Sequence, residues 1–377
     1  MNNTPQSNRL HVGIFGKANV GKSTIFNAIT ETDTAIVSDI PGTTTDPVQK
    51  AMELVPFGPI VLIDTAGLND DTSLGRKRTE KTDKLLKRVD FAIYVIEAGD
   101  ENKNEYEEFA KMGIPHLKVV TKGHTKPDIE ALKNSLSHEL CKIKKDSETL
   151  LGDLLAPGST VLMVVPLDSE SPKGRLILPQ AQLIRDCLDN SFMAYVSTEK
   201  ELETALANIK KVDLVVTDSQ IFGPVSEKVP ENILLTSFSI LMARQKGGIE
   251  TLLKGLDIIN RLKDHDKILV SEVCTHNHTH EDIGRVKIPA ALRKLTGKKL
   301  DFDFTAGRDY PEDLSRYALI IHCGACMITP REMKNRILAA NKAKVPITNY
   351  GLFLAFASGI LKRSIEVTNP SVKERRS

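Results

Sequence analysis

The segment Gly16–Ser23, with the sequence GKANVGKS, decides the fold of the first part of this chain, because it fits the phosphate-binding pattern G-x-x-x-x-G-K-[ST]. An apolar run, Leu10–Phe15, ends directly before it, and a helix pattern, Ser23–Ile29, begins at its last residue. Glycines let the backbone wrap closely, so that its N–H groups and the helix N-terminus face phosphate oxygens. The segment therefore predicts a nucleoside triphosphate site, with Lys22 at the β- and γ-phosphates and the Ser23 hydroxyl on Mg²⁺.

Two later segments fit the same site. The sequence DTAG, Asp64–Gly67, ends an apolar run, where a carboxylate holds Mg²⁺ through water and the Gly67 N–H senses the γ-phosphate. Between the two lies PGTTTD, Pro41–Asp46, where a switch loop offers a threonine hydroxyl to Mg²⁺; Thr44 is the first choice and Thr43 the second. The predicted nucleotide-binding residues are Gly16, Asn19, Val20, Gly21, Lys22, Ser23, Thr24, Asp64, Gly67 and Lys122, and those predicted for Mg²⁺ are Ser23, Thr44 and Asp64.

With these motifs the first segment resembles the translation-factor-like GTPases, most closely the tRNA-modifying and Era-like branch. The resemblance implies that Asn19 helps to bind K⁺ and that GTP hydrolysis is slow and potassium-stimulated. From the residues alone, an ordinary turn role for Asn19 is equally open. The guanine-reading N-K-x-D is replaced by TKGH, Thr121–His124, and the reading aspartate is missing. We therefore expect triphosphate binding, a shortened base pocket and weak GTPase turnover.

The strand and helix patterns continue to the end of the chain and predict an α/β protein of three domains. A P-loop GTPase-like domain spans 1–148, and two smaller α/β units with mainly parallel sheets span 149–262 and 263–377. Among the apolar runs that predict strands are Thr160–Pro166, Leu214–Thr217, Ile268–Val273 and Tyr317–Ile321.

Composition narrows the function classes. The formal net charge of +2 and the absence of basic patches interleaved with aromatic residues argue against nucleic-acid and membrane partners. No apolar run reaches the roughly 18 residues of a membrane span, and Met1–Arg9 lacks the apolar stretch of a signal peptide. We therefore expect a cytoplasmic protein, in which the five cysteines are ligands or core residues rather than disulfides.

Three cysteines form a ligand pattern. Cys274 is followed by His276, and the sequence HCGAC places His322 before Cys323 and Cys326. Both groups follow apolar strands, and the carboxyl ends of parallel strands are where open α/β sheets bind ligands. Three thiolates predict a cluster with one open or weakly held iron, with His276 or His322 as fourth ligand. A closed Cys₃His zinc site is the rival. Cys141 and Cys187, on helix patterns, are expected to be structural.

The C-x-H…H-C-x-x-C pattern behind a P-loop domain makes the whole chain resemble the HydF family of FeFe-hydrogenase maturation proteins. Further family-like stretches are Ser171–Gln180, Thr217–Gln220, Leu235–Ile240, Asp282–Pro289 and Pro346–Gly351. The resemblance implies a 4Fe-4S cluster on Cys274, Cys323 and Cys326, and a homodimer formed by the middle domain. It also implies a scaffold that takes a diiron precursor as cargo and passes it to apo FeFe-hydrogenase, alongside radical-SAM maturation enzymes.

Two other functions remain open on the residues alone. One is a tRNA- or ribosome-directed GTPase with a structural zinc site, which absorbance separates from an iron–sulfur protein because zinc sites are colourless. The other is a redox enzyme, which should carry a further cofactor motif; the sequence holds no second G-x-G-x-x-G after a strand.

Overall fold

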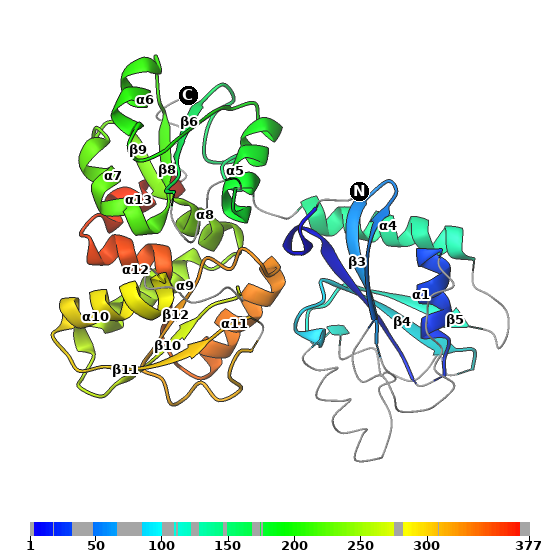
Figure 1. Cartoon of the computed structure of the whole chain (residues 1–377). Helices are drawn as coiled ribbons and strands as arrows, with labels where there is room; N and C mark the ends of the chain where they lie inside the picture. Colours follow the sequence, from blue (N-terminus) through cyan, green and yellow to red (C-terminus); the bar gives the residue numbers. More distant parts are fainter. Residues whose placement is uncertain are drawn as a thin grey trace. The chain divides into compact units, whose positions relative to one another are not determined.

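The computed structural model describes residues 4–17, 19–31, 48–65, 85–99, 109–110, 112–121, 128–145, 149–167, 174, 176–274, 282–307 and 309–369. The chain divides into two compact units, Met1–Ser147 and Glu148–Ser377 (Figure 1). In the described part of the chain, no helix combines the length and apolar character needed to cross a bilayer.

The first unit is built on a five-stranded sheet in the order β2-β3-β1-β4-β5. The strands β1 (Leu10–Phe15), β3 (Gly58–Asp64), β4 (Phe91–Glu97) and β5 (His116–Thr121) are parallel to one another, and β2 (Val48–Leu54) pairs antiparallel with β3. All carboxyl ends of the parallel strands therefore lie at one edge, where the P-loop follows β1. This is the α/β organisation that the sequence predicts for this segment.

Alternate side chains of β1 belong to two different hydrophobic cores, one on each face of the sheet. Val12 and Ile14 of β1 share a core with the helices α1 (Lys22–Thr30) and α4 (Ile129–Lys145). Phe15 belongs instead to the core on the opposite face. Because successive strand residues point to opposite faces, the almost continuous apolar run of β1 indicates a strand buried on both sides.

The first sheet of the second unit has the order β7-β6-β8-β9, and all its pairs are parallel. Its strands are β6 (Thr160–Val164), β7 (Met193–Ser197), β8 (Leu214–Thr217) and β9 (Leu234–Ser237). The helical elements that follow these strands are α5 (Leu178–Asp189), α6 (Leu202–Asn208), η3 (Ser219–Ile221), α7 (Phe222–Lys228) and α8 (Phe238–Gln245). β7 is an edge strand, and its Met193, Tyr195 and Val196 are exposed.

The second sheet has the order β11-β10-β12-β13 and is also wholly parallel. Its strands are β10 (Lys267–Ser271), β11 (Asp301–Thr305), β12 (Leu319–His322) and β13 (Ile347–Asn349). Its helical elements are α9 (Ile249–Lys254), η4 (Gly255–Arg261), η5 (Ile283–Lys287), α10 (Ile288–Thr296), α11 (Pro330–Lys342), α12 (Tyr350–Ala357), α13 (Leu361–Ile365) and η6 (Glu366–Thr368).

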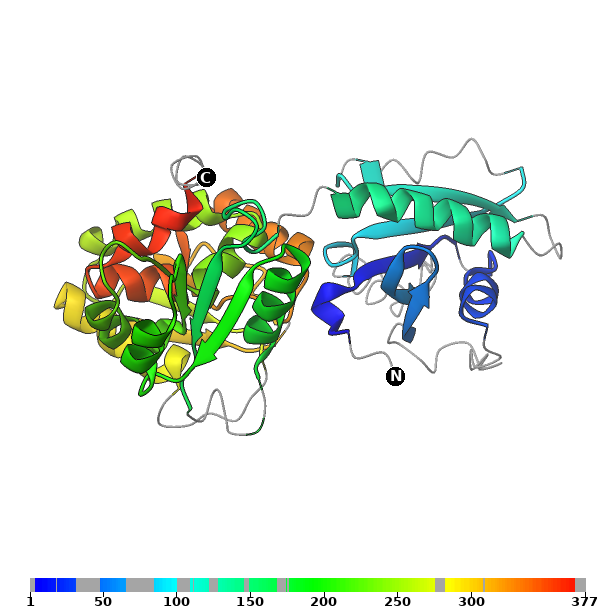
Figure 2. The ribbon, with the colours of Figure 1, turned by 90° about the horizontal axis from the view of Figure 1, so that it is seen from above.

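The two sheets of the second unit share one hydrophobic core, which the view from above shows as a single body (Figure 2). Their carboxyl ends meet. Asn349, at the end of β13, donates its side-chain N–H to the backbone oxygen of Ser239 at 2.9 Å, and the Gly351 N–H donates to the Ser239 hydroxyl at 3.2 Å. A side chain at Gly351 would lie 2.8 Å from the Ser239 Cβ, so this contact needs a glycine.

Candidate nucleotide and cysteine sites

The phosphate-binding loop follows β1 as predicted, and its glycines are structural requirements. Gly16 has φ +145°, and a Cβ there would lie 2.3 Å from the Val95 backbone oxygen of β4. Gly21, with φ +94°, precedes the first residue of α1. Asn19 also adopts a left-handed conformation, which asparagine tolerates better than most residues. The described part of the loop therefore curves tightly around the start of α1.

Lys22 is buried inside this curve, with 6% of its surface exposed. Its Nζ donates to the backbone oxygens of Gly16 at 3.0 Å and Lys17 at 2.6 Å. Burial lowers the pKa of Lys22 to about 8, against a smaller opposing effect of the nearby Asp64 carboxylate. The ammonium is thus a desolvated cation at the start of a helix. A phosphate bound there would supply the negative charge that compensates it.

Ser23 and Asp64 lie side by side at the same sheet edge. The Ser23 hydroxyl donates to Asp64 Oδ2 at 2.6 Å. The other carboxylate oxygen, Oδ1, is buried with no hydrogen-bond partner, and burial raises the pKa of Asp64 above its ordinary value. A hydroxyl beside a carboxylate with one unpaired oxygen provides the hard oxygen ligands that Mg²⁺ prefers. Two of the three residues that the sequence assigns to Mg²⁺, Ser23 and Asp64, are therefore brought together.

A further residue of the nucleotide site was missed by the sequence analysis. Thr121, the last residue of β5, donates its hydroxyl to the Ile96 backbone oxygen at 3.1 Å and approaches the Val20 backbone oxygen at 3.3 Å. It therefore fastens the carboxyl end of β5 to the phosphate loop and to β4. Thr44, Gly67 and Lys122 lie outside the described residues, as do Gly123 and His124.

The cysteine pattern is brought together by two neighbouring strands. β10 and β12 are parallel, with Ser271 beside His322, so Cys274 and Cys323 both follow at the same edge. The Cys323 N–H donates to the Ser271 backbone oxygen at 2.9 Å. The Cys323 sulfur accepts N–H groups from Val273 at 3.4 Å and Ala325 at 3.5 Å. The expectation that parallel strands bring both cysteine groups to one sheet edge is confirmed.

The donor chemistry at this edge fits a thiolate-bound metal group. Burial, followed by the charge of Cys274, raises the pKa of Cys323 to about 12, so a thiolate there needs a cation close by. Two amide N–H groups on its sulfur are the kind of hydrogen bonds that tune iron–sulfur clusters. Among the described residues, no three His, Cys, Asp or Glu side chains already form a metal-binding group. Cys326 is partly exposed. Cys187 is a buried core residue, as predicted, whereas Cys141 is exposed and the expectation that it is a core residue is wrong.

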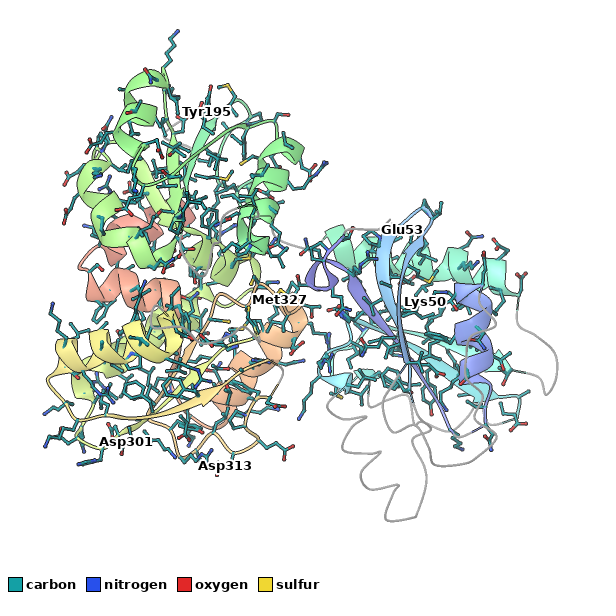
Figure 3. The ribbon with its side chains drawn as sticks, in the orientation of Figure 1. Lys50, Glu53, Tyr195, Asp301, Asp313 and Met327 are labelled. Atoms are coloured by element: carbon teal, nitrogen blue, oxygen red, sulfur yellow. The ribbon has the colours of Figure 1, made fainter. Side chains whose placement is uncertain are left out.

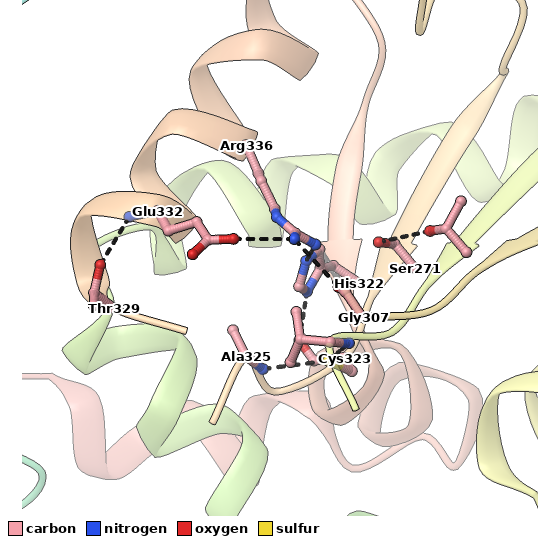
Figure 4. A network of polar contacts seen from close by, with 10 residues as sticks. Ser271, Gly307, His322, Cys323, Ala325, Thr329, Glu332 and Arg336 are labelled. Carbon is pink, nitrogen blue, oxygen red and sulfur yellow. Dashed lines mark hydrogen bonds and ion pairs between the residues drawn. The ribbon is translucent and has the colours of Figure 1, made fainter. Parts of the chain in front are cut away.

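His322 is fully buried and has both ring nitrogens engaged (Figure 4). Its Nδ1 lies 2.9 Å from the Cys323 backbone oxygen, and its Nε2 lies 3.1 Å from Nη1 of Arg336. Burial and the Arg336 charge lower the pKa of His322 to about 3, so the ring is neutral. In this arrangement His322 offers no nitrogen to a metal, contrary to the expectation that it could be the fourth ligand. The other candidate, His276, lies outside the described residues.

A mainly parallel sheet with a glycine-rich phosphate loop and a Ser–Asp pair at its carboxyl edge defines the class of P-loop nucleotide-binding proteins, here joined to two small parallel α/β sheets. The family of 50S ribosome-binding GTPases matches residues 11–122. The hydrogen maturase F dimerization domain matches residues 150–247, and the tetramerization domain of the same protein matches residues 250–367. The chain belongs to the hydrogen maturase F (HydF) family.

Curated relatives match mainly in the GTPase domain. The tRNA modification GTPase MnmE of Prochlorococcus marinus (strain MIT 9215) is 34% identical over 155 residues, 39% of this chain and 33% of the relative. MnmE of Thermoanaerobacter sp. (strain X514) is 41% identical over 102 residues, 26% of this chain and 22% of the relative. GTPase Der of Kosmotoga olearia is 32% identical over 146 residues, 36% of this chain and 33% of the relative. The chain thus spans a third or less of these three relatives.

Solved structures that are similar include the G domain of the Thermotoga maritima FeoB iron transporter, at 26% identity. That similarity covers 35% of this chain and 99% of the other, with a TM-score of 0.23. Era of Aquifex aeolicus is 15% identical, covering 79% of this chain and 92% of the other, with a TM-score of 0.27.

Proposed function

We propose that this protein is a GTP-binding maturation scaffold that holds a 4Fe-4S cluster and delivers a diiron precursor to apo FeFe-hydrogenase. The observation that carries the proposal is that Cys274 and Cys323 follow the carboxyl ends of two adjacent parallel strands, in a chain that matches both hydrogen maturase F domains. Radical-SAM maturation enzymes are the proposed source of the cargo. The proposed domain boundaries are 1–148, 149–262 and 263–377.

In the nucleotide domain, Lys22 is proposed to neutralise the β- and γ-phosphates of GTP, and Ser23 and Asp64 to hold Mg²⁺. The buried ammonium and the partnerless Asp64 oxygen support these roles. Thr44 is proposed to join Ser23 and Asp64 at Mg²⁺ and Gly67 to sense the γ-phosphate, so that triphosphate binding orders both loops and biases partner docking. Asn19 is proposed to assist a weak, K⁺-stimulated hydrolysis, a role that its left-handed turn position permits.

In the cysteine domain, Cys274, Cys323 and Cys326 are proposed to hold the cluster. When bound, such a cluster supplies an iron with a fourth position that exchanges ligands. The chain's own part is to supply three thiolates and to direct the Val273 and Ala325 N–H groups at one of them. His276 remains the proposed fourth ligand, because the ring of His322 is already engaged.

Self-association is proposed through the middle sheet. The backbone of β7 is paired only on its β6 side within the described sheet. Tyr195 at its surface is 43% exposed (Figure 3). A second copy of β7 would pair this edge and cover Met193, Tyr195 and Val196. A cytoplasmic location is proposed because all five cysteines are free thiols, which a reducing compartment maintains.

The test is activation of apo FeFe-hydrogenase by the full chain after loading with cluster and diiron precursor. Wild type should produce hydrogen-evolving enzyme, and Cys323→Ser should not, because the cluster loses a ligand. Cys187→Ser is the matched control, since Cys187 is a buried core cysteine away from this edge, and it should retain activation. Equal activation by Cys323→Ser and wild type would contradict the proposed carrier role.

A GTPase directed at tRNA or the ribosome, with a structural zinc, is the second candidate. The observation that favours it is the likeness of the first domain to MnmE and to the 50S ribosome-binding GTPases. Tight binding of one zinc by the purified chain, with no uptake of iron, would support this alternative.

A further inference from the structure

Arg336 on α11 is a buried cation beside the cysteine edge, with about 5% of its side chain exposed. Its guanidinium donates to Glu332 Oε1 at 3.3 Å and approaches the Gly307 backbone oxygen at 3.5 Å. It also lies over the Tyr310 ring, 4.9 Å from the centroid, and contacts His322 Nε2 at 3.1 Å (Figure 4). Among the described residues, the guanidinium therefore contacts a carboxylate, a backbone oxygen, an aromatic ring and an imidazole.

The contact with His322 fixes where the ring carries its proton. A guanidinium only donates hydrogen bonds, so Nε2 of His322 must be the acceptor. The proton of the neutral ring is then on Nδ1, which donates to the Cys323 backbone oxygen at 2.9 Å. Arg336 thus determines the tautomer of His322, and His322 in turn holds the peptide that follows Cys323.

That peptide begins a turn that needs support. Ala325 adopts φ +56°, a left-handed conformation that is unfavourable for a residue with a Cβ. In this conformation its N–H points at the Cys323 sulfur at 3.5 Å. The turn also packs closely, because a Cβ on Gly324 would lie 3.3 Å from the Ser239 hydroxyl. Holding the Cys323 carbonyl therefore holds the turn in the shape that directs an amide at the sulfur.

We propose that Arg336 is a positioning residue for the cluster, which acts through the His322 ring to preform the Cys323 turn and contributes a fixed positive charge that favours the reduced cluster. This inference rests on the proposed cluster function. Glu332 opposes Arg336 electrostatically, because its buried carboxylate lies on the far side of the same guanidinium.

Two variants should therefore shift the reduction potential in opposite directions. Arg336→Met removes the cation and leaves the Glu332 carboxylate buried, so the ratio of reduced to oxidised cluster at a fixed potential should fall at least tenfold. For a one-electron couple this equals 59 mV. Glu332→Gln removes the opposing charge and should raise the potential. A role confined to folding predicts lower stability in both variants and no such pair of opposite shifts.

The experiment uses the full chain in two states. Nitrogen-15 NMR of the protein before iron is added should show the His322 proton on Nδ1, and in Arg336→Met a mixture of tautomers. EPR-monitored titration after iron–sulfide reconstitution then gives the potentials. Arg363→Met is the control, since Arg363 donates to the backbone oxygens of Val229 and Pro230, which follow α7, and should change stability without moving the potential.

The outcomes separate the two proposals. A proton on Nε2 in the wild type, or equal potentials in wild type, Arg336→Met and Glu332→Gln, would overturn the inference. If Arg336→Met does not fold, the inference is still tested by two measurements. These are the rise in reduction potential expected for Glu332→Gln and the His322 tautomer of the wild type. If the wild type shows the Nδ1 proton yet takes up no iron, the proposed cluster function fails, and the charge effect of Arg336 fails with it.

Discussion

Replacing Lys22 by methionine should abolish nucleotide binding and yet stabilise the first unit in the absence of nucleotide. Methionine keeps the apolar stem of the side chain but removes the buried ammonium. The lowering of the Lys22 pKa from 10.5 to about 8 corresponds to about 3 kcal/mol of unfavourable charge burial. Loss of the two hydrogen bonds to Gly16 and Lys17 costs about 1 kcal/mol each. The net expected gain in the free energy of unfolding is therefore about 1 kcal/mol.

The gain should depend on pH in a defined direction. Below pH 8 the ammonium is charged in both the folded and the unfolded chain, so the whole cost of burial applies. Between pH 8 and 10.5 the folded chain releases the proton first, so wild-type stability rises with pH and the advantage of Lys22→Met shrinks. Below pH 8 the buried charge lowers the free energy of unfolding, and bound triphosphate should remove this destabilisation.

Hydrogen exchange of the full chain without nucleotide, measured on amides of β1 and β4, gives the local unfolding free energy. A fluorescent GTP analogue measures binding in the same samples. Lys133→Met is the matched control: Lys133 pairs with the exposed Glu31, and its loss should change stability by less than about 1 kcal/mol. A Lys22→Met protein that is less stable than wild type below pH 8, or that still binds GTP, would refute this account of the loop.

Three further outcomes follow from the same geometry. Ser23→Ala should weaken Mg²⁺-dependent GTP binding about tenfold and leave Mg²⁺-free binding unchanged, as calorimetry with and without EDTA can show. Gly16→Ala should destabilise the first unit by about 3 kcal/mol in hydrogen exchange, because its Cβ would clash with the Val95 backbone oxygen. Tyr195→Lys should shift the dimer toward monomer in light scattering at unchanged GTP affinity, and an unchanged mass would exclude β7 as the contact.

The sequence alone was sufficient to predict those parts of the sites that are built from neighbouring residues of one strand–loop–helix unit. The phosphate loop is such a case: the pattern fixes its glycines, Lys22 and Ser23, and the structure places them as expected. The placement of Cys274 and Cys323 at one edge was also predictable, because the residues that follow two neighbouring parallel strands share an edge of the sheet. Wholly parallel sheets in the second unit make that inference correct.

The remaining contacts depend on side chains from separate elements, which no local pattern reports. Thr121 stands where N-K-x-D has its asparagine, and its hydroxyl reaches the Val20 backbone oxygen of the phosphate loop. His322 looked like a ligand because it adjoins a cysteine; its partner Arg336 lies on α11 at an unremarkable helix position. The His322–Arg336 contact depends on the packing of α11 against β12, so only the fold reveals it.

We propose above all that this chain carries an iron–sulfur cluster on the edge where β10 and β12 end. Anaerobic iron–sulfide reconstitution of the full chain, followed by metal analysis, absorbance and EPR after dithionite reduction, tests it most directly. We expect about four irons per chain, a broad absorbance band and the EPR signal of a reduced cluster with one unpaired electron, all lost in Cys323→Ser. A colourless protein that holds one tightly bound zinc and takes up no iron would contradict it.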